Sequence, residues 1–389
     1  MSTHITPSLH KNKSLSKVFL LFCFAFLSIL PIYRNFYYSN GLLTYERHKA
    51  VIEKRSEYYN PWQYRVLCPY IIEGIITIYN ATINKIFPLE NKVNLSIENT
   101  TGTTNETDQF FKLLQIPGAM QYMIIFILFR FIEHLFIFYL SWKLWSYFVK
   151  SKLLIFLGIN FLALSLGNAV AVADLSFNTY LDIIFYLSTA VIIVYKKNSF
   201  LFIPIIILGA FNRETSILIP ALYFISHTDF TKFRLNKYSW NSIIFPTKQT
   251  WLFTVLLYTL FFSIFIGLRL YFGYKPQQVW KAAAGLPMLK LNLFSAVAVK
   301  SIMELIGTFA VIPLIILYYF KSIPHLLKKW FLFIVPIWFG VHFVSVVAYQ
   351  TRLFIVPLVI ILIPMFLWLI ENELNNSTEN KVLKENNHL

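Results

Sequence analysis

The sequence predicts an all-α, polytopic transmembrane helical bundle. Hydrophobic residues make up 57% of the 389 residues, aromatic residues make up 18%, and the mean hydropathy is +0.60. Long apolar runs without charges recur along the chain, and a stretch of about 20 such residues is what a membrane-spanning helix needs. Together these observations exclude a soluble globular enzyme and indicate a chain surrounded by lipid.

The basic residues support the same class. The formal net charge is +16, but Lys and Arg stand in short clusters between apolar runs and do not form a basic domain. We therefore expect them to mark cytoplasmic loops and to contact membrane lipid headgroups, with no nucleic acid as a partner. Two cysteines, Cys23 and Cys68, are too few for a disulfide or thiolate metal framework.

The apolar runs predict about eight spans and one re-entrant hairpin within a transmembrane domain of residues 1–372. The first span, Lys17 to about Tyr37, is expected to be retained because it lacks a small-residue cleavage site. The further runs lie at 119–148, 153–172, 177–195, 199–227, 250–272, 302–320, 329–347 and 352–370. Residues 34–118 form a long first loop, and the polar segment 373–389 is expected to be a disordered cytoplasmic tail.

The hairpin follows from the sidedness of the loops. If the N-terminus is cytoplasmic, the Lys-rich loops all fall on that side only when 199–227 enters and leaves on the same side. Each arm, 199–211 and 215–227, would be a helix of roughly 20 Å, shorter than the ~30 Å hydrocarbon core. The hairpin tip then carries Asn212-Arg213-Glu214-Thr215, and the loop 34–118 becomes extracytoplasmic.

A layer of charged residues is expected at the depth of this tip. Asp182 lies about six residues inside a helix that starts on the outer side, and Arg352 begins the last helix from that side. In one interpretation Arg213 pairs with Asp182 or Glu214 and holds helices together, because charges within a membrane usually neutralise one another. In the other, these side chains line a substrate cavity. Both interpretations stay open.

The first loop supplies further charges. Glu46 and Glu53 are seven residues apart, and Glu57 follows at the next turn, so the three would share one face of an interfacial helix. The segment from Tyr64 to Phe87 has too short an apolar run for a span and predicts a second interfacial helix.

Three charged or polar residues lie together near the middle of the run 119–148. Arg130, Glu133 and His134 lie on one helix face by their spacing, which predicts an Arg130–Glu133 pair. The alternative is a polar cavity wall or a proton path, because a proton-coupled transporter uses an intramembrane His beside a Glu.

The segments "GAFNRETSILIPALYF" and "NPWQYRVLCPY" carry a family resemblance. The first is similar to the small residue, basic residue and Pro-ended apolar run of the GT-C superfamily of integral-membrane glycosyltransferases. The second is similar to segments of uncharacterised bacterial membrane proteins. One span followed by a long, acidic first loop also resembles GT-C. The resemblance implies a hexosyltransferase that uses a polyprenyl-phosphate-linked sugar donor at the extracytoplasmic face of a bacterial plasma (inner) membrane.

Such a transfer needs a carboxylate to take a proton from the acceptor and cations to stabilise the departing phosphate. Many members carry Asp after the first helix, whereas this loop offers only glutamates there, so the predicted base is Glu46, with Asp182 as a second catalytic candidate. The predicted substrate-binding residues are Arg65, Arg213, Glu214, Arg352, Arg130, Glu133 and His134. The chain lacks a metal-ligand spacing such as HExxH, and a divalent cation is left open as a cofactor.

Two other functions use similar residues. A transporter or flippase of a lipid-linked or small anionic substrate would also need buried Arg and Asp beside a broken helix. Transporters usually contain paired broken helices in symmetric halves, and this sequence predicts one broken segment. A polysaccharide polymerase or ligase that uses the same lipid carrier is the third candidate.

Overall fold

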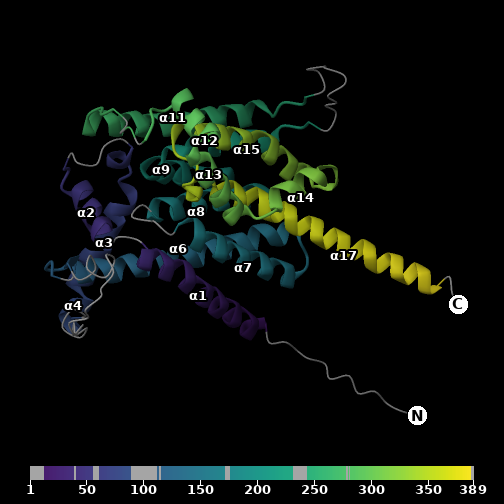
Figure 1. Cartoon of the computed structure of the whole chain (residues 1–389), viewed down its shortest axis with the longest axis horizontal. Helices are drawn as coiled ribbons and strands as arrows, with labels where there is room; N and C mark the ends of the chain where they lie inside the picture. Colours follow the sequence, from purple (N-terminus) through teal and green to yellow (C-terminus); the bar gives the residue numbers. More distant parts are fainter. Residues whose placement is uncertain are drawn as a thin grey trace, which may run out of the picture.

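The computed structural model describes residues 13–38, 41–55, 61–88, 112–113, 115–170, 176–230, 243–276, 279 and 281–386. Seven helices among them are long and apolar enough to cross a membrane. They are α1 (Lys13–Tyr38), α6 (Ala119–Phe148), α7 (Lys152–Ala169), α8 (Ser176–Val194), α11 (Lys248–Phe272), α15 (His325–Ser345) and the segment Thr351–Ser377, which ends in α17 (Ile363–Asn386) (Figure 1). A bent pair, α13 (Ala296–Phe309) with α14 (Ile312–Tyr318), adds an eighth if it crosses as one span. The chain is therefore a multi-pass membrane protein, which confirms the predicted fold class.

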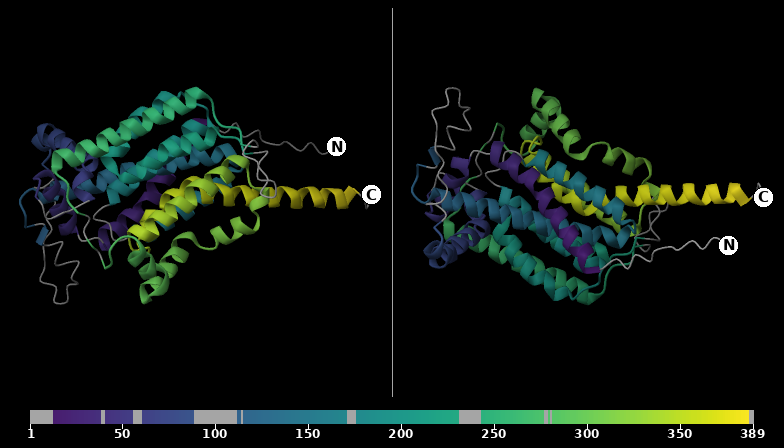
Figure 2. Two further views of the ribbon diagram at one scale, coloured as in Figure 1. Left: turned by 90° about the horizontal axis from the view of Figure 1, so that it is seen from above. Right: turned by 90° about the horizontal axis from the view of Figure 1, so that it is seen from below.

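Shorter described helices that flank the spans lie in the first loop, in the hairpin, before α13 and after α15. They are α2 (Gly41–Ile52), η1 (Trp62–Tyr64), α3 (Leu67–Ala81), α4 (Ile83–Ile86), α9 (Phe202–Asn212), η4 (Glu214–Ile217), α10 (Leu218–His227), α12 (Leu286–Phe294) and η7 (Thr351–Phe354). The helices α2, α3 and α4 gather at the end of the bundle opposite to the C-terminal part of α17 (Figure 2). We call this end the loop end.

At the opposite end of the bundle, polar contacts join α17 to its neighbours. There, the carboxylate of Glu371 on α17 accepts hydrogen bonds from the backbone N–H groups of Lys150 at 3.0 Å and Ser151 at 2.6 Å, between α6 and α7. The indole of Trp368 donates to the carbonyl of Ser322, which precedes α15, at 3.2 Å. These contacts bring the end of α6 and the segment before α15 against α17. Which end faces the cytoplasm stays a prediction.

The segment 199–227 doubles back, as predicted. The rings of Phe202 on α9 and Tyr223 on α10 lie 4.9 Å apart between centroids. A continuous helix would separate these two residues by roughly 30 Å. Both rings also contact Phe253 near the start of α11, at 6.5 and 5.5 Å. The chain therefore enters and leaves at the same end, which is the geometry of a re-entrant hairpin.

The tip of the hairpin is held by polar contacts. Asn212 ends α9, and its side-chain amide donates to the carbonyl of Asn178 at 2.9 Å while its side-chain oxygen accepts from the Asn178 amide at 3.1 Å. Arg213 then adopts an extended conformation. Gly209 allows the turn to close, because a Cβ at this position would lie 2.7 Å from the hydroxyl of Ser216. The break in the helix thus depends on Gly209 and Asn212, which lie near the end of α9.

A second break separates α13 and α14, which the sequence predicts as part of one span over 302–320. The two helices meet at 76°. Ala310 has φ 50°, in the left-handed region that a residue with a Cβ rarely adopts, and Pro313 is the second residue of the next helix. The bend turns α13 toward the loop end of the bundle (Figure 2).

The first loop helix ends earlier than expected. The N–H of Arg55 donates to the carbonyl of Ala50 at 2.9 Å, and that of Lys54 donates to Val51 at 3.3 Å. This is the Schellman pattern, with Lys54 in the left-handed conformation where glycine is usual. It ends α2 at Ile52.

The termination of α2 at Ile52 corrects the prediction that Glu46 and Glu53 share one helix face, because Glu53 follows the last residue of α2. Glu57 and the loop residues 89–111 lie outside the described residues. The predicted second loop helix is present as α3 and α4, and α3 is not among the candidate spans.

The loop helices are tied to α6 by one polar cluster. The carboxylate of Glu73 on α3 lies 2.8 Å from Nε2 of His48 on α2 and accepts a hydrogen bond from the hydroxyl of Tyr122 on α6, also at 2.8 Å. The ammonium group of Lys49 donates to the same hydroxyl at 2.8 Å. These bonds fix the position of α2, and hence of the residues around it.

The C-terminal segment differs from its predicted disorder. The helix α17 continues to Asn386, and residues 387–389 lie outside the described part of the chain. A polar segment that extends an existing helix does not have to nucleate one, and this segment contains the helix formers Glu, Leu and Lys. Helix continuation explains why polar composition alone gave the wrong expectation here.

Candidate functional site

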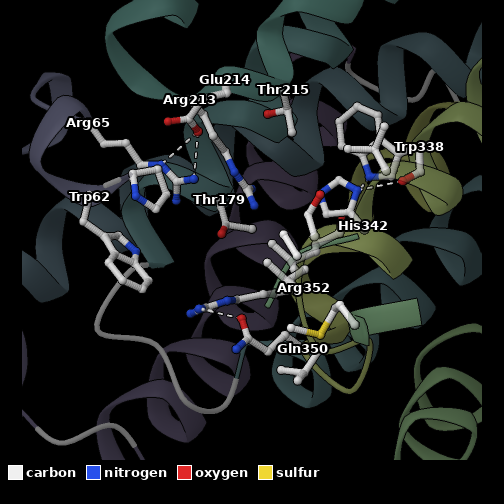
Figure 3. Close-up of a pocket in the computed structure, with 18 of the residues that line it drawn as sticks. Trp62, Arg65, Thr179, Arg213, Glu214, Thr215, Trp338, His342, Gln350 and Arg352 are labelled. Atoms are coloured by element: carbon white, nitrogen blue, oxygen red, sulfur yellow. Dashed lines mark hydrogen bonds and ion pairs between the residues drawn. The ribbon is translucent and has the colours of Figure 1, made fainter. Parts of the chain in front are cut away.

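A cavity of about 1060 Å³ opens near the loop end. The hairpin tip, η1, α15 and η7 contribute to its wall (Figure 3), and α11 and α13 supply further lining residues. Its charged lining residues are Arg47, Arg65, Arg213, Arg269, Lys300 and Arg352, with two carboxylates, Glu214 and Glu304. Its apolar lining includes Ile217, Leu218, Phe261, Phe262, Phe265, Trp338 and Val341. The wall therefore combines an excess of cations with an aromatic and aliphatic surface.

Glu214 at the hairpin tip is enclosed by two arginines. Arg65, which follows η1, donates to one carboxylate oxygen of Glu214 from Nε at 3.2 Å and from Nη2 at 2.8 Å. Arg269 on α11 approaches the other oxygen at 4.0 Å, and its guanidinium lies 3.3 Å from the ring centroid of Phe265 and 4.4 Å from that of Tyr64. This cluster joins three elements that are distant in the sequence.

Asp182 and Arg213 lie together, as the predicted charged layer requires. A nitrogen of Arg213 is 3.5 Å from a carboxylate oxygen of Asp182, and the hydroxyl of Thr215 donates to the same oxygen at 2.8 Å. Arg213 also lines the cavity, whereas Asp182 is fully buried and does not. Both interpretations thus apply to Arg213, which holds α8 to the hairpin and contributes to the cavity.

Arg352 enters the same space from η7. Figure 3 shows Arg65, Arg213 and Arg352 extending from separate elements into one region. Gln350, at the start of η7, accepts a hydrogen bond from Arg352 at 3.3 Å. Of the predicted site residues, Arg65, Arg213, Glu214 and Arg352 therefore come together in the cavity wall.

Glu46 is outside the site. Its side chain is exposed on α2, and the cavity is lined by its neighbour Arg47, whose guanidinium lies 5.5 Å from the ring centroid of Trp62. A helix turns about 100° per residue, so neighbouring side chains face different directions. Glu46 follows the first span in sequence, as expected, but it is not among the residues that line the cavity.

The residues Arg130, Glu133 and His134 are also outside the cavity. All three are buried in α6, where the Arg130 guanidinium lies 4.5 Å from the Phe177 ring centroid and the His134 ring lies 4.4 Å from that of Tyr180. Neither carboxylate oxygen of Glu133 has a hydrogen-bond partner among the described residues. No hydrogen bond joins Arg130 to Glu133 in the described part of the chain, so the predicted pair is not a hydrogen-bonded one: helical spacing placed the residues on one side of α6 but did not fix their side-chain directions.

Several lining residues were missed by the sequence analysis. They are Arg47, Arg269, Lys300, Glu304 and His342. Lys300 and Glu304 are four residues apart at the start of a predicted span, a spacing that could have drawn attention to them. His342 had a weaker signal, because a single His in an apolar run is more often a core residue than a functional one.

The cavity wall supports anion binding more clearly than metal binding. Planar guanidinium groups bind phosphate or carboxylate through two hydrogen bonds, and their charge persists in apolar surroundings. No group of three or more His, Cys, Asp or Glu side chains that could hold a metal ion occurs in the part of the chain that the structure describes.

Comparison with known proteins adds no family. No protein-family model matches this chain, and no curated protein and no solved structure matches it.

Proposed function

We propose that this protein is a membrane glycosyltransferase that uses a polyprenyl-phosphate-linked sugar as its donor. The observation that carries the proposal is the cavity wall, in which three guanidinium groups, from the residue after η1, the hairpin and η7, face one space beside an aromatic surface. An amphipathic ligand with an anionic phosphate and an apolar tail has the chemistry that matches both halves of this wall.

A groove on α11 next to the cavity supports the proposal. Phe262 on α11 lines the cavity and also a separate groove of about 500 Å³ on α11, which Val255, Tyr258, Ile266 and Leu270 help to form. Only 17% of the apolar stretch of α11 is buried, so this helix presents most of its surface outward. A polyprenyl chain could leave the cavity past Phe262 and lie along α11 in the lipid.

The arginines would act on the phosphate in two ways. They would bind it in the ground state, and they would stabilise the negative charge that grows on it as the bond to the sugar breaks. The ion pairs of Arg65 and Arg213 with Glu214 and Asp182 hold the guanidinium groups in place before the donor arrives. Prepositioned charges stabilise a transition state without a reorganisation cost.

The test uses the purified full chain in nanodiscs, with short-chain polyprenyl-phosphate hexoses as donors and methyl glycosides as acceptors. We expect release of polyprenyl phosphate together with a new glycoside. The double variant Arg213→Gln, Arg352→Gln should lower turnover by at least about 10²-fold, the usual effect of losing one charge-stabilising donor. Arg34→Gln is the matched control, since Arg34 is an exposed arginine of α1 that does not line the cavity.

A flippase would give a different result in the same preparation. If proteoliposomes moved a labelled polyprenyl phosphate across the bilayer while the donors stayed intact, transport would replace glycosyl transfer. If the sugar were added to a growing glycan and not to a simple glycoside, the polymerase or ligase would be the better description.

A further inference from the structure

His342 has one ring nitrogen that is hydrogen-bonded and one that makes no hydrogen bond to a described residue. It lies on α15, lines the cavity and is 7% exposed. Its Nδ1 is 2.7 Å from the backbone oxygen of Trp338. A carbonyl oxygen can only accept, so Nδ1 carries the hydrogen and Nε2 of the neutral ring carries a lone pair. This tautomer is the one that can accept a proton at Nε2.

The ring is held in place by its neighbours. It stacks on Trp338 with 5.5 Å between centroids and 21° between planes, and it packs against Phe354 at 5.5 Å. The Trp338 indole in turn donates to the carbonyl of Leu353 at 2.7 Å. Nε2 makes no hydrogen bond to any described residue, and the imidazole lies beside the space that Arg213 and Arg352 enter (Figure 3). The ring is thus oriented by contacts on one side and open on the other.

The carboxylates near the cavity are less suited to accept a proton. Glu214 already accepts two hydrogen bonds from Arg65, and hydrogen bonds to a carboxylate stabilise its charged form. Asp182 is fully buried and lies outside the lining. Glu304 on α13 lines the cavity and is partly exposed, which makes it the rival that an experiment must separate from His342.

We propose that His342 is the catalytic base of the transfer, an assignment that rests on the proposed function. The acceptor hydroxyl oxygen forms a bond to the anomeric carbon of the donor sugar, and the bond between that carbon and the phosphate oxygen breaks. The bonding electron pair leaves with the phosphate, beside Arg213 and Arg352. The hydroxyl proton moves to Nε2 of His342 and then to water.

The experiment compares three variants in the nanodisc transfer assay. His342→Asn retains an amide in the position of Nδ1, which can still donate to Trp338, and lacks Nε2. We expect its kcat to fall by roughly 10²- to 10⁴-fold, the usual effect of losing a general base, with donor binding unchanged. Added imidazole should restore part of the rate, and the loss of rate at acid pH should disappear. His325→Asn, an exposed histidine at the other end of α15, should behave as wild type.

Glu304→Gln completes the comparison and should keep the acid limb of the pH profile. If His342→Asn kept full turnover, or if Glu304→Gln abolished the acid limb and His342→Asn did not, the base assignment would be overturned while the proposed function stood. If wild-type protein transferred no sugar, both would fall. A His342→Asn protein that did not fold would be replaced by His342→Gln, with the same criteria.

Discussion

The charges of the hairpin tip and those of α6 lie between apolar helices in both cases, but their surroundings differ. At the tip, Arg213 contacts Asp182, Glu214 contacts Arg65, and both Arg213 and Glu214 reach the cavity. On α6, Glu133 is buried with neither carboxylate oxygen hydrogen-bonded among the described residues. The first set is paired and open to the cavity, and the second is enclosed.

The difference originates in the backbone. The helix breaks after Asn212, so the following side chains leave the end of a helix and can extend into a cavity. The helix α6 is continuous over 30 residues, so its charged side chains remain packed against neighbouring helices. Charge within an apolar run does not by itself indicate a ligand site, and a break in the helix at the charged residues is the stronger signal.

The largest expected effect on stability distinguishes paired from unpaired carboxylates. Asp182→Leu leaves Arg213 without its carboxylate partner, and breaking a buried ion pair typically costs about 3–5 kcal/mol. Glu133→Met replaces a carboxylate that accepts no hydrogen bond from the described residues by an apolar side chain of similar size, and it should leave the melting temperature unchanged or raise it. Thermal unfolding in one detergent measures both. A Glu133→Met protein less stable than Asp182→Leu would reverse the assignment of paired and unpaired charges.

A smaller effect concerns pH at the loop end, where His48 and Glu73 meet outside the candidate spans. Burial lowers the pKa of His48. Burial by itself would raise the pKa of the Glu73 carboxyl. The hydrogen bonds from His48 and Tyr122 together outweigh burial and hold this pKa below its usual range. Both shifts mean that the unfolded chain binds more protons than the folded one, so stability falls as pH drops below the usual His value of about 6.5 and declines further below the usual Glu value of about 4.3.

The measurement is the melting temperature from pH 8 to pH 4 in wild type and in the double variant His48→Phe, Glu73→Gln. The variant should be less stable at pH 8 and should lose less stability on acidification. An equal slope in both proteins would mean that this pair does not control the acid response of the loop helices.

The smallest expected effect is that of Glu46→Gln. Because Glu46 is exposed and outside the cavity wall, the substitution should change stability by no more than about 0.5 kcal/mol and should leave turnover within experimental error of wild type. A collapse of turnover would restore Glu46 as the base and would remove the role proposed for His342.

The spans and the hairpin could be predicted from the sequence because they depend on local properties. Run length, hydropathy and the sidedness of Lys predict eight crossings, of which seven are present as candidate spans and the eighth corresponds to the bent pair α13 and α14. The polar Asn212-Arg213-Glu214-Thr215 marks the turn of the hairpin. The bend at Ala310 was not predicted, because hydropathy does not fall around it, although Pro313 in the same apolar run is a signal for a break.

The site was predictable only in part. Arg65, Arg213 and Arg352 were identified because an arginine in or beside an apolar run is costly unless it is used. The pairing of Arg65 with Glu214 joins residues 149 positions apart, and nothing local encodes it. The orientation of His342 depends on its bond to Trp338, and the exclusion of Glu46 depends on the rotation of α2, so both required the structure.

The central claim is that the cavity holds a phosphate headgroup, and cryo-electron microscopy of the protein saturated with a polyprenyl phosphate tests it most directly. We expect density for the phosphate within hydrogen-bonding distance of the guanidinium groups of Arg213 and Arg352, with the start of the apolar chain passing Phe262. The Arg213→Gln, Arg352→Gln protein should lack this density under the same conditions. Phosphate density outside the cavity, or equal density in wild type and the double variant, would contradict the claim.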